Sequence, residues 1–407
     1  MAAAPSDRAH PRLLNLVLAQ GISATGDMLL LTAASIAIFK ETDSATAVSL
    51  LLGVAALPTV ILGPLAGTFA DWFSRRRMMI IADLASAVAC VVAVIASMLT
   101  GVEVAAFLSV AIVAALSSFY RPAAQALLPT LAGKSQLERA NSGIRLGTSL
   151  AAIVGPATAG LLVGRLGFEF LLLLDAATFA ASALLIVGIT RVPPMPTVER
   201  RSAFTDSVEG LRYARRHPRL RIVIGAIGIT LLVGTVVNAG TLALVSRVFG
   251  LPESRYGLLL AIEGAGAMTL ALVLLYLGPR IRLLPTGAAA LIAVGGSTVM
   301  LGSSPNLQWA AVAITIQGMA VVGLQVAFAS YIQQQAADAF RGRVMALTGM
   351  VASLASLAGF GVAGFLVDGL GVRESFTFAG AVICAAAVPV VGLAWRAARE
   401  ERVAALA

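Results

Sequence analysis

The sequence predicts an all-α integral membrane protein, with twelve transmembrane helices in two pseudo-symmetric six-helix bundles. The composition, the spacing of apolar runs and an internal repeat support this prediction. Hydrophobic residues make up 59% of the 407 residues, charged residues only 12%, and the mean hydropathy is +0.92. Soluble proteins carry about 25% charged residues because their surfaces face water. Soluble enzymes, secreted disulfide-rich proteins and disordered chains are therefore excluded.

Apolar runs long enough to cross the hydrocarbon layer follow one another along the chain, separated by charged residues, prolines or glycines. They must be helical, because a lipid-exposed backbone amide finds no external hydrogen-bond partner. The boundary between the fifth and sixth runs rests only on the glycines within 164–167. The expected spans are 13–39, 46–70, 78–100, 104–131, 141–166, 168–190, 220–249, 255–278, 283–303, 307–333, 344–370 and 373–396.

The basic residues predict the orientation of these spans. With a cytoplasmic N-terminus, twenty-three of the 29 lysines and arginines face the cytoplasm, five face the other side, and Arg121 lies within a span. Such a bias follows the positive-inside rule. We therefore expect a multi-pass protein of the cell membrane with both termini in the cytoplasm. The net charge of +9 then serves membrane insertion, and nucleic acid is not an expected partner.

The longest polar segment lies near the middle of the chain. Residues 191–219 are predicted to be a cytoplasmic linker, with one surface helix around 202–216. The linker would separate an N-terminal six-helix half, 1–190, from a C-terminal six-helix half, 220–407.

An internal repeat favours duplication of the two halves. Shifting the chain by 204 residues aligns 139–167 with 343–371, and three glycines of the first segment fall on glycines of the second. Helices rich in alanine, glycine and leucine can match by chance, but glycines held in register favour a true repeat. Parallel repeats of six spans are a known plan of membrane transporters.

The end of the second span carries a short motif. It reads Gly67-Thr-Phe-Ala-Asp71-Trp-Phe-Ser-Arg75-Arg76 and resembles the signature loop of the major facilitator superfamily. The four numbered residues match the pattern, whereas the tryptophan and the serine depart from it. The resemblance implies that this loop forms part of a cytoplasmic gate. Alternatively, the arginines only set the topology.

The fifth span contains Gly155-Pro156-Ala-Thr-Ala-Gly160, which is similar to the Gly-Pro motif of exporters in that superfamily. The motif implies a helix shaped for the interface between halves, and tight helix packing is the alternative explanation. With stretches of spans one, four and eleven, it resembles the branch of macrolide-efflux and catecholate-siderophore exporters. The resemblance implies a monomeric secondary transporter that exports small amphiphilic molecules by alternating access. Uptake or facilitated transport of a polar nutrient is the alternative.

Ionisable residues within the membrane are costly and are functional hypotheses by default. A proton-coupled exporter needs a carboxyl group that can gain and lose a proton as access alternates. Asp27 in span one and Glu263 in span eight are the candidates. The alternative for Asp27 is a structural role, and the alternative for Glu263 is an ion pair with an arginine.

Four further charged residues lie in or near the spans. Asp175 and Arg121 are also candidates for coupling or substrate binding. Helix packing is the favoured role of Asp175, and Arg121 either pairs with an acid or reaches the cytoplasmic interface. Asp83 and Asp368 lie near span ends, where we expect them to be hydrated.

Polar side chains in mid-span are candidates for the lining of a substrate cavity, although each can instead hydrogen-bond across the bundle. Two of the glutamines lie eight residues apart and thus on about the same helix face. The candidates are Gln20, Ser23, Asn238, Gln317, Gln325 and Tyr331.

The sequence shows no pattern typical of an enzyme. It has no metal-ligand spacing, phosphate-binding glycine loop or nucleophile motif. Cys90 and Cys384 lie in separate apolar runs, where single thiols behave as small hydrophobes. We therefore expect no enzymatic activity, cofactor or metal, and the expected partners are a small-molecule substrate, protons and the lipid bilayer.

Overall fold

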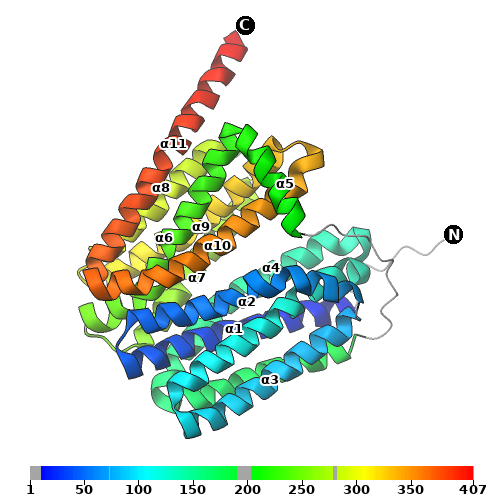
Figure 1. Ribbon diagram of the computed structural model, residues 1–407, viewed down its shortest axis with the longest axis vertical. Coiled ribbons are helices and arrows are strands. Elements are labelled where there is room, and N and C mark those ends of the chain that lie inside the picture. Colours follow the sequence, from blue (N-terminus) through cyan, green and yellow to red (C-terminus); the bar gives the residue numbers. More distant parts are fainter. Residues whose placement is uncertain (1–10, 73, 190–202, 278–281, 407) are drawn as a thin grey trace, which may run out of the picture. The chain divides into compact units, whose positions relative to one another are not determined.

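The computed structural model describes residues 11–72, 74–189, 203–277 and 282–406, and all regular elements in these ranges are helices. They are α1 (Pro11–Thr42), α2 (Ala45–Trp72), α3 (Arg75–Thr100), α4 (Val102–Val187), α5 (Ala203–Arg216), α6 (Pro218–Ala243), the π-helix η1 (Leu244–Val248), α7 (Ser254–Leu277), α8 (Leu283–Gly302), α9 (Leu307–Gln335), α10 (Asp338–Leu370) and α11 (Val372–Leu406). Figure 1 shows their arrangement.

Helix α4 contains three successive spans. Its 86 residues are interrupted by non-helical backbone at Gly133 (φ 62°) and Gly167 (φ 81°), a region of φ that glycine adopts without steric cost. Eleven helical stretches of the described residues are long and apolar enough to cross a membrane, and the one from 136 to 187 divides at Gly167. The predicted twelve-helix membrane fold is confirmed, including the break between spans five and six.

The repeat seen in the sequence recurs in the backbone. Gly371, which matches Gly167 at the offset of 204, has a φ of 99° and separates α10 from α11. A Cβ on Gly155 would lie 2.7 Å from Cβ of Met28 in α1. A Cβ on Gly359 would likewise meet Leu232 in α6, 204 residues after Met28. Equivalent glycines thus allow equivalent helix pairs to approach closely.

The chain forms two compact units. Unit 1 consists of residues 1–34 and 61–199, and unit 2 of residues 35–60 and 200–407. The end of α1 and the start of α2 therefore pack with the helices of unit 2. The predicted linker lies partly outside the described residues, and the division into six-helix halves stays a prediction.

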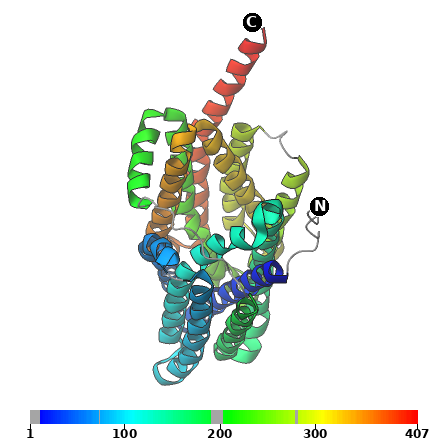
Figure 2. The same ribbon diagram turned by 90° about the vertical axis from the view of Figure 1, so that its right-hand side faces the viewer.

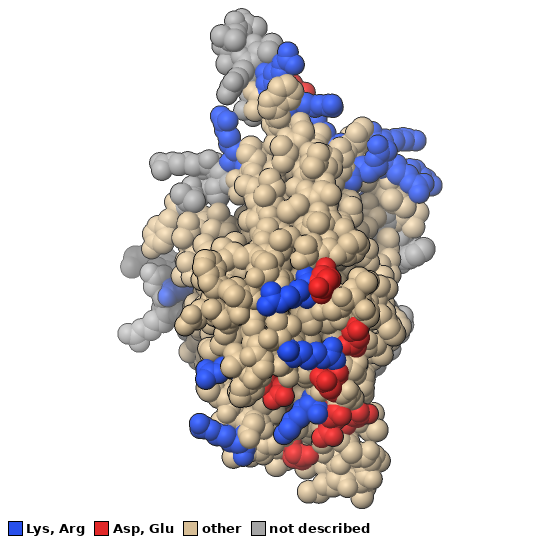
Figure 3. Space-filling view, turned by 90° about the vertical axis from the view of Figure 1, so that its left-hand side faces the viewer, with Lys and Arg blue, Asp and Glu red and all other residues tan. Residues whose placement is uncertain are grey.

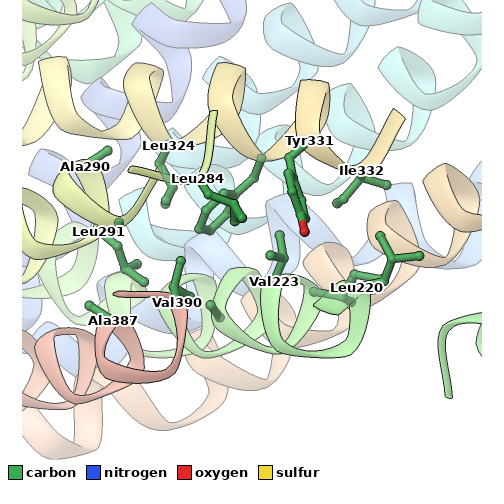
Figure 4. Close-up of a cluster of buried hydrophobic side chains, with 14 of the residues drawn as sticks. Leu220, Val223, Leu284, Ala290, Leu291, Leu324, Tyr331, Ile332, Ala387 and Val390 are labelled. Carbon is green, nitrogen blue, oxygen red and sulfur yellow. The ribbon is translucent and has the colours of Figure 1, made fainter. Parts of the chain in front are cut away.

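Each unit has its own apolar core. In unit 1, side chains of α1, α3 and α4 form the core, with Leu16, Met79 and Leu127 fully buried. In unit 2, α6, α8, α9, α10 and α11 contribute, and Val223 and Leu291 are fully buried (Figure 4). Many large apolar side chains instead face outward, as expected of helices that contact lipid. Figure 3 shows wide surface areas without any charged side chain.

The predicted surface helix is present as α5, which lies beside α10 (Figures 1 and 2). Glu209 forms an ion pair of 2.9 Å with Arg343 at the start of α10. Gly210 lies against the backbone of Arg343, and the ring of Tyr213 stacks on Phe340 at 4.6 Å. Helix α5 is therefore docked on α10 within unit 2.

Candidate functional site

Asp27 lies on α1 at a place where α1 packs tightly against α4. Gly21 and Gly147 are in backbone contact there, as are Gly155 and the turn of α1 that follows Asp27. The carboxylate accepts a hydrogen bond of 3.4 Å from Ser117 and lies 3.5 Å from the guanidinium of Arg121, both on α4. Its side chain is only 16% exposed.

Arg121 therefore pairs with an acid of unit 1, one of the two roles expected for it. Only one partner of this ion pair is buried, because the Arg121 side chain is 65% exposed. Asp27 is thus joined to a cation whose side chain is largely exposed.

Asp83 on α3 is buried, with 1% of its surface exposed, which corrects the expectation that it is hydrated. Ser182 donates a hydrogen bond of 2.7 Å to one carboxyl oxygen, and Ser23 donates one of 3.4 Å to the other. The hydroxyl of Tyr120 lies 3.4 Å from that of Ser182. The expectation failed because α3 begins at Arg75, earlier than the apolar run, so Asp83 lies two turns inside the bundle.

Asp175 is fully buried in the last part of α4. Its carboxyl group accepts hydrogen bonds from Thr178 at 3.0 Å and from the thiol of Cys90 at 3.6 Å. The space that it fills exists because Gly26 has no side chain, and a Cβ there would collide with Asp175 and Thr178. These contacts fit the packing role expected of Asp175 and the buried state expected of Cys90.

Three carboxyl groups from α1, α3 and α4 thus lie near one another inside unit 1. Asp27 is close enough to interact electrostatically with both Asp83 and Asp175. Within the described part of the chain, Arg121 is the cation that pairs with this cluster. Buried charge of one sign is costly unless it is neutralised. Uptake of a proton would neutralise part of this charge.

Gln20 and Ser23 share a face of α1 with Asp27, since they precede it by seven and four residues. The side-chain nitrogen of Gln20 is buried and has no hydrogen-bond partner among the described residues. Ser23 bonds to Asp83 and thus belongs to the acid cluster, whereas Gln20 lies two turns before Asp27 on the same helix face.

Unit 2 contains a cavity of about 540 Å³ that is lined by α6, α7, α8, α9 and α10. Four predicted residues from three helices line it together, namely Asn238, Glu263, Gln317 and Gln325. Apolar side chains such as Leu231, Val321 and Phe328 form much of the remaining wall. Tyr331 lies outside this lining and borders a different cavity.

Two glycines bring Glu263 beside Gln317. A Cβ on Gly266 would lie 2.6 Å from the carbonyl oxygen of Thr315, and a Cβ on Gly318 would collide with the backbone of Glu263. Helices α7 and α9 can therefore touch through their backbones. The side-chain amide oxygen Oε1 of Gln317 accepts hydrogen bonds from the hydroxyl groups of Ser297 and Thr298.

The Glu263 carboxyl group has no hydrogen bond or ion pair to any side chain in the part of the chain that the structure describes. Among these residues, Glu263 therefore forms no ion pair with an arginine, which was the alternative role expected from the sequence. An acid that borders a mainly apolar cavity without a partner suits the recognition of a cation or the carriage of a proton.

The motif at the end of α2 is described only in part. Gly67 and Asp71 belong to α2, but their side chains lie outside the described residues. Arg75 donates a hydrogen bond of 3.1 Å to the carbonyl of Ala126, and Arg76 donates one of 2.6 Å to the carbonyl of Val187 at the end of α4. Cations favour helix C-termini, where carbonyls lack partners.

The Gly-Pro motif lies in the middle part of α4, where Gly155, Pro156 and Gly160 are buried. Gly155 contacts α1 within unit 1. This packing is what the alternative explanation expects, and a role at the interface between halves stays a prediction.

Sequence reasoning missed a cluster of polar contacts in unit 2. Asp368 near the end of α10 accepts hydrogen bonds from the backbone nitrogens of Ala45 and Thr46 at 3.1 and 2.8 Å, and forms an ion pair of 2.8 Å with Arg247. Arg247 also pairs with Asp43 at 3.1 Å. The expectation that Asp368 is simply hydrated is therefore wrong. A signal existed, because Asp43 and Arg247 are separated by the repeat offset of 204.

Comparison with known proteins identifies the family. The profile described as Major Facilitator Superfamily matches residues 16–359 and 239–406. The chain belongs to the major facilitator superfamily. It is therefore a multi-pass membrane transporter, as the signature loop and the repeat indicated.

Several relatives in this superfamily match nearly the whole chain. The uncharacterized MFS-type transporter YfiS of Bacillus subtilis is 26% identical over 96% of this chain and 93% of its own. The multidrug efflux pump Tap of Mycobacterium tuberculosis is 27% identical over 91% of this chain and 90% of its own. Macrolide efflux protein A of Streptococcus pyogenes is 25% identical over 91% of this chain and 92% of its own.

Solved structures agree with the fold. A mutant of the nucleoside transporter NupG superposes with a TM-score of 0.80 at 12% identity, covering 94% of this chain and 99% of that chain. A bacterial homologue of the iron transporter ferroportin superposes with a TM-score of 0.75 at 15% identity, covering 94% of this chain and 98% of that chain. At such identities the likeness concerns the fold alone.

Proposed function

We propose that this transporter exports small amphiphilic compounds, cationic ones among them, across the cell membrane in exchange for protons. The observation that carries the proposal is Glu263, which has no side-chain partner among the described residues and lies at the wall of a largely apolar cavity of about 540 Å³. An apolar wall accepts lipophilic surface of varied shape, and the carboxylate favours a positive group. The efflux pumps among the relatives support the export direction.

Coupling is assigned to two acids. Glu263 binds either the cationic substrate or a proton, so the arrival of one displaces the other. Asp27 is the second site, because its partner Arg121 holds it in place while remaining reachable. Alternating access of two six-helix halves, 1–190 and 220–407, would carry the cavity from one side to the other. The loop around Asp71 would form part of the cytoplasmic gate.

The proposed orientation follows from the arginines. With both termini in the cytoplasm, the basic residues follow the positive-inside rule. A monomer working alone is the proposed unit, as the superfamily resemblance implies.

Accumulation of test compounds in everted membrane vesicles, in which an exporter transports inward, tests the function. We expect accumulation of a lipophilic cation or a macrolide when a pH gradient is imposed, and loss of accumulation when an ionophore collapses it. Asp27→Asn and Glu263→Gln should each lower gradient-driven transport by at least about tenfold, since each removes a group that must bind a proton. The matched control is Asp338→Asn, whose side chain is 91% exposed and which should transport normally.

Two outcomes would contradict the proposal in different ways. Normal gradient-driven transport in both acid variants, at equal protein amounts, would show that coupling lies elsewhere. Movement of the test compounds only in the uptake direction would overturn export itself.

A further inference from the structure

Unit 2 has a second cavity, of about 720 Å³, at the end of the bundle where α6 and α8 begin and where α7, α9 and α11 end. It shares no lining residue with the cavity around Glu263. We call it the basic pocket and define it by Arg219, Arg282, Tyr331, Gln334 and Glu400, with the apolar residues described below.

The basic pocket carries an uncompensated positive charge. Arg219 and Glu400 neutralise each other through two hydrogen bonds of 2.9 Å. The guanidinium of Arg282 has no ion pair with any residue for which the structure gives a position. A guanidinium offers several donors in a planar fork that suits phosphate oxygens. The pocket therefore favours an anion with acceptor oxygens.

Tyr331 supplies an independent observation. The residue is 5% exposed, and its hydroxyl group has no hydrogen-bond partner among the described residues. Figure 4 shows its ring extending from α9 towards α6, with the hydroxyl oxygen near Leu220 and Val223. A buried hydroxyl group without a partner is costly. Tyr331 also borders the pocket, where the charges of Arg219 and Glu400 act on it, so an acceptor atom that reaches its hydroxyl group would remove this cost.

The pocket opens at the depth expected of lipid headgroups. Tyr276 on α7 is 92% exposed and Trp395 on α11 is 65% exposed. Each lies within two residues of a pocket-lining position, Leu274 and Ala394 respectively. Exposed tyrosine and tryptophan side chains mark the membrane–water interface. The pocket therefore lies at the depth of the membrane–water interface.

One wall of the pocket is apolar, formed by Leu274, Leu283, Leu284, Val326 and Ala397. Such a wall makes no favourable contact with a free inorganic anion, but it can pack against the first methylene groups of an acyl chain. Basic pockets between transmembrane helices are suited to anionic headgroups.

We propose that the basic pocket binds the phosphate group of an acidic phospholipid, with Arg282 and Tyr331 donating to its oxygens. Inorganic phosphate shares the headgroup chemistry but lacks the chain that the apolar wall would contact. The proposal is independent of the substrate and of proton coupling.

Binding is tested on the purified full-length protein in detergent, with dioleoylphosphatidylglycerol, dioleoylphosphatidylcholine and inorganic phosphate as separate probes. We expect phosphatidylglycerol to raise the unfolding temperature and to remain bound in native mass spectrometry, with little effect of the other two. A ligand that binds only the folded state stabilises it in proportion to its affinity. Arg282→Gln and Tyr331→Phe should each weaken phosphatidylglycerol binding by about tenfold, the loss of one hydrogen bond to a charged group.

The variants themselves provide the controls. Without lipid, Tyr331→Phe should be at least as stable as the unsubstituted protein, because it removes a buried hydroxyl group that has no hydrogen-bond partner among the described residues. Arg255→Gln changes an exposed arginine at the other end of α7 and should leave lipid binding unchanged.

Three results would overturn the proposal. Equal stabilisation by phosphatidylcholine would remove the role of charge, and equal stabilisation by inorganic phosphate would make this a site for soluble anions. Unchanged phosphatidylglycerol binding in both Arg282→Gln and Tyr331→Phe would place any lipid elsewhere. None of these measurements involves transport, so they stand whether or not the export proposal holds.

Discussion

Glycine positions decide where acids and amides of this transporter lie. Gly26 leaves room for the Asp175 carboxyl group, and Gly318 lets α9 approach the backbone of Glu263. Small residues at helix contacts are the main device for close packing inside a membrane. Placement of the polar residues therefore depends on residues that have no side chain.

Gly155 provides a direct test at this scale. A Cβ there would lie 2.7 Å from Cβ of Met28 and 2.9 Å from the carbonyl oxygen of Thr25, so Gly155→Ala must push α1 away. We expect a loss of stability of about 1–3 kcal/mol, measured as a lower unfolding temperature in detergent. Gly164→Ala is the control, because a Cβ there meets nothing within 4 Å. Equal unfolding temperatures for the two variants would show that the α1–α4 contact is looser than described.

Single residues also show the limits of sequence reasoning. Asp27 and Glu263 could be recognised because a charge in mid-span is rare. Asp83 could not, because its burial depends on where α3 begins and on hydroxyl groups from α1 and α4. Those contacts come from residues 60 and 99 positions away in the chain.

At the scale of elements, Asp368 acts as an N-terminal cap supplied by a distant helix. Helix α2 starts at Ala45, and its first backbone amides donate to the Asp368 carboxylate of α10. The first amides of a helix lack internal partners, and a carboxylate there is favoured by the helix dipole. Arg247 in the π-helix η1 joins the same carboxylate.

Asp368→Ala should therefore destabilise the protein by about 1–3 kcal/mol, because it leaves these amides and Arg247 without their acceptor. The check is the unfolding temperature of the purified variant. Asp338→Ala removes a carboxylate whose ion pair is largely exposed and should cost less than about 1 kcal/mol. If the two variants unfold alike, the cap contributes nothing measurable to α2.

Element boundaries were partly visible in the sequence. The break at Gly167 was expected from glycine alone, and its partner Gly371 follows from the repeat. The extension of α11 to Leu406, ten residues past the expected span, was not expected, because polar helical residues beyond the lipid carry no apolar signal. A helix can continue past the membrane wherever backbone hydrogen bonding allows it.

For the whole molecule, the distribution of arginines predicts which segments face the cytoplasm. Cysteine labelling in a background without Cys90 and Cys384 tests this directly. We expect a membrane-impermeant maleimide to label Glu253→Cys, between η1 and α7, in intact cells. Leu211→Cys in α5 should react only after the cells are permeabilised, since α5 belongs to the arginine-rich side. Labelling of Leu211→Cys in intact cells would invert the proposed topology.

The sequence by itself determined the membrane class, the twelve spans, the repeat and the superfamily. Each of these depends on local hydropathy or on short motifs. They can be recognised in the sequence because contact with lipid and the need for backbone hydrogen bonds constrain each segment separately. The tertiary structure decided which polar residues meet. It joined Asp27 to Arg121, buried Asp83, gathered Glu263 with Asn238, Gln317 and Gln325, and separated Tyr331 from them. Hydropathy cannot report these pairings, because they depend on how distant helices pack and rotate about their axes, which close contacts between small residues set.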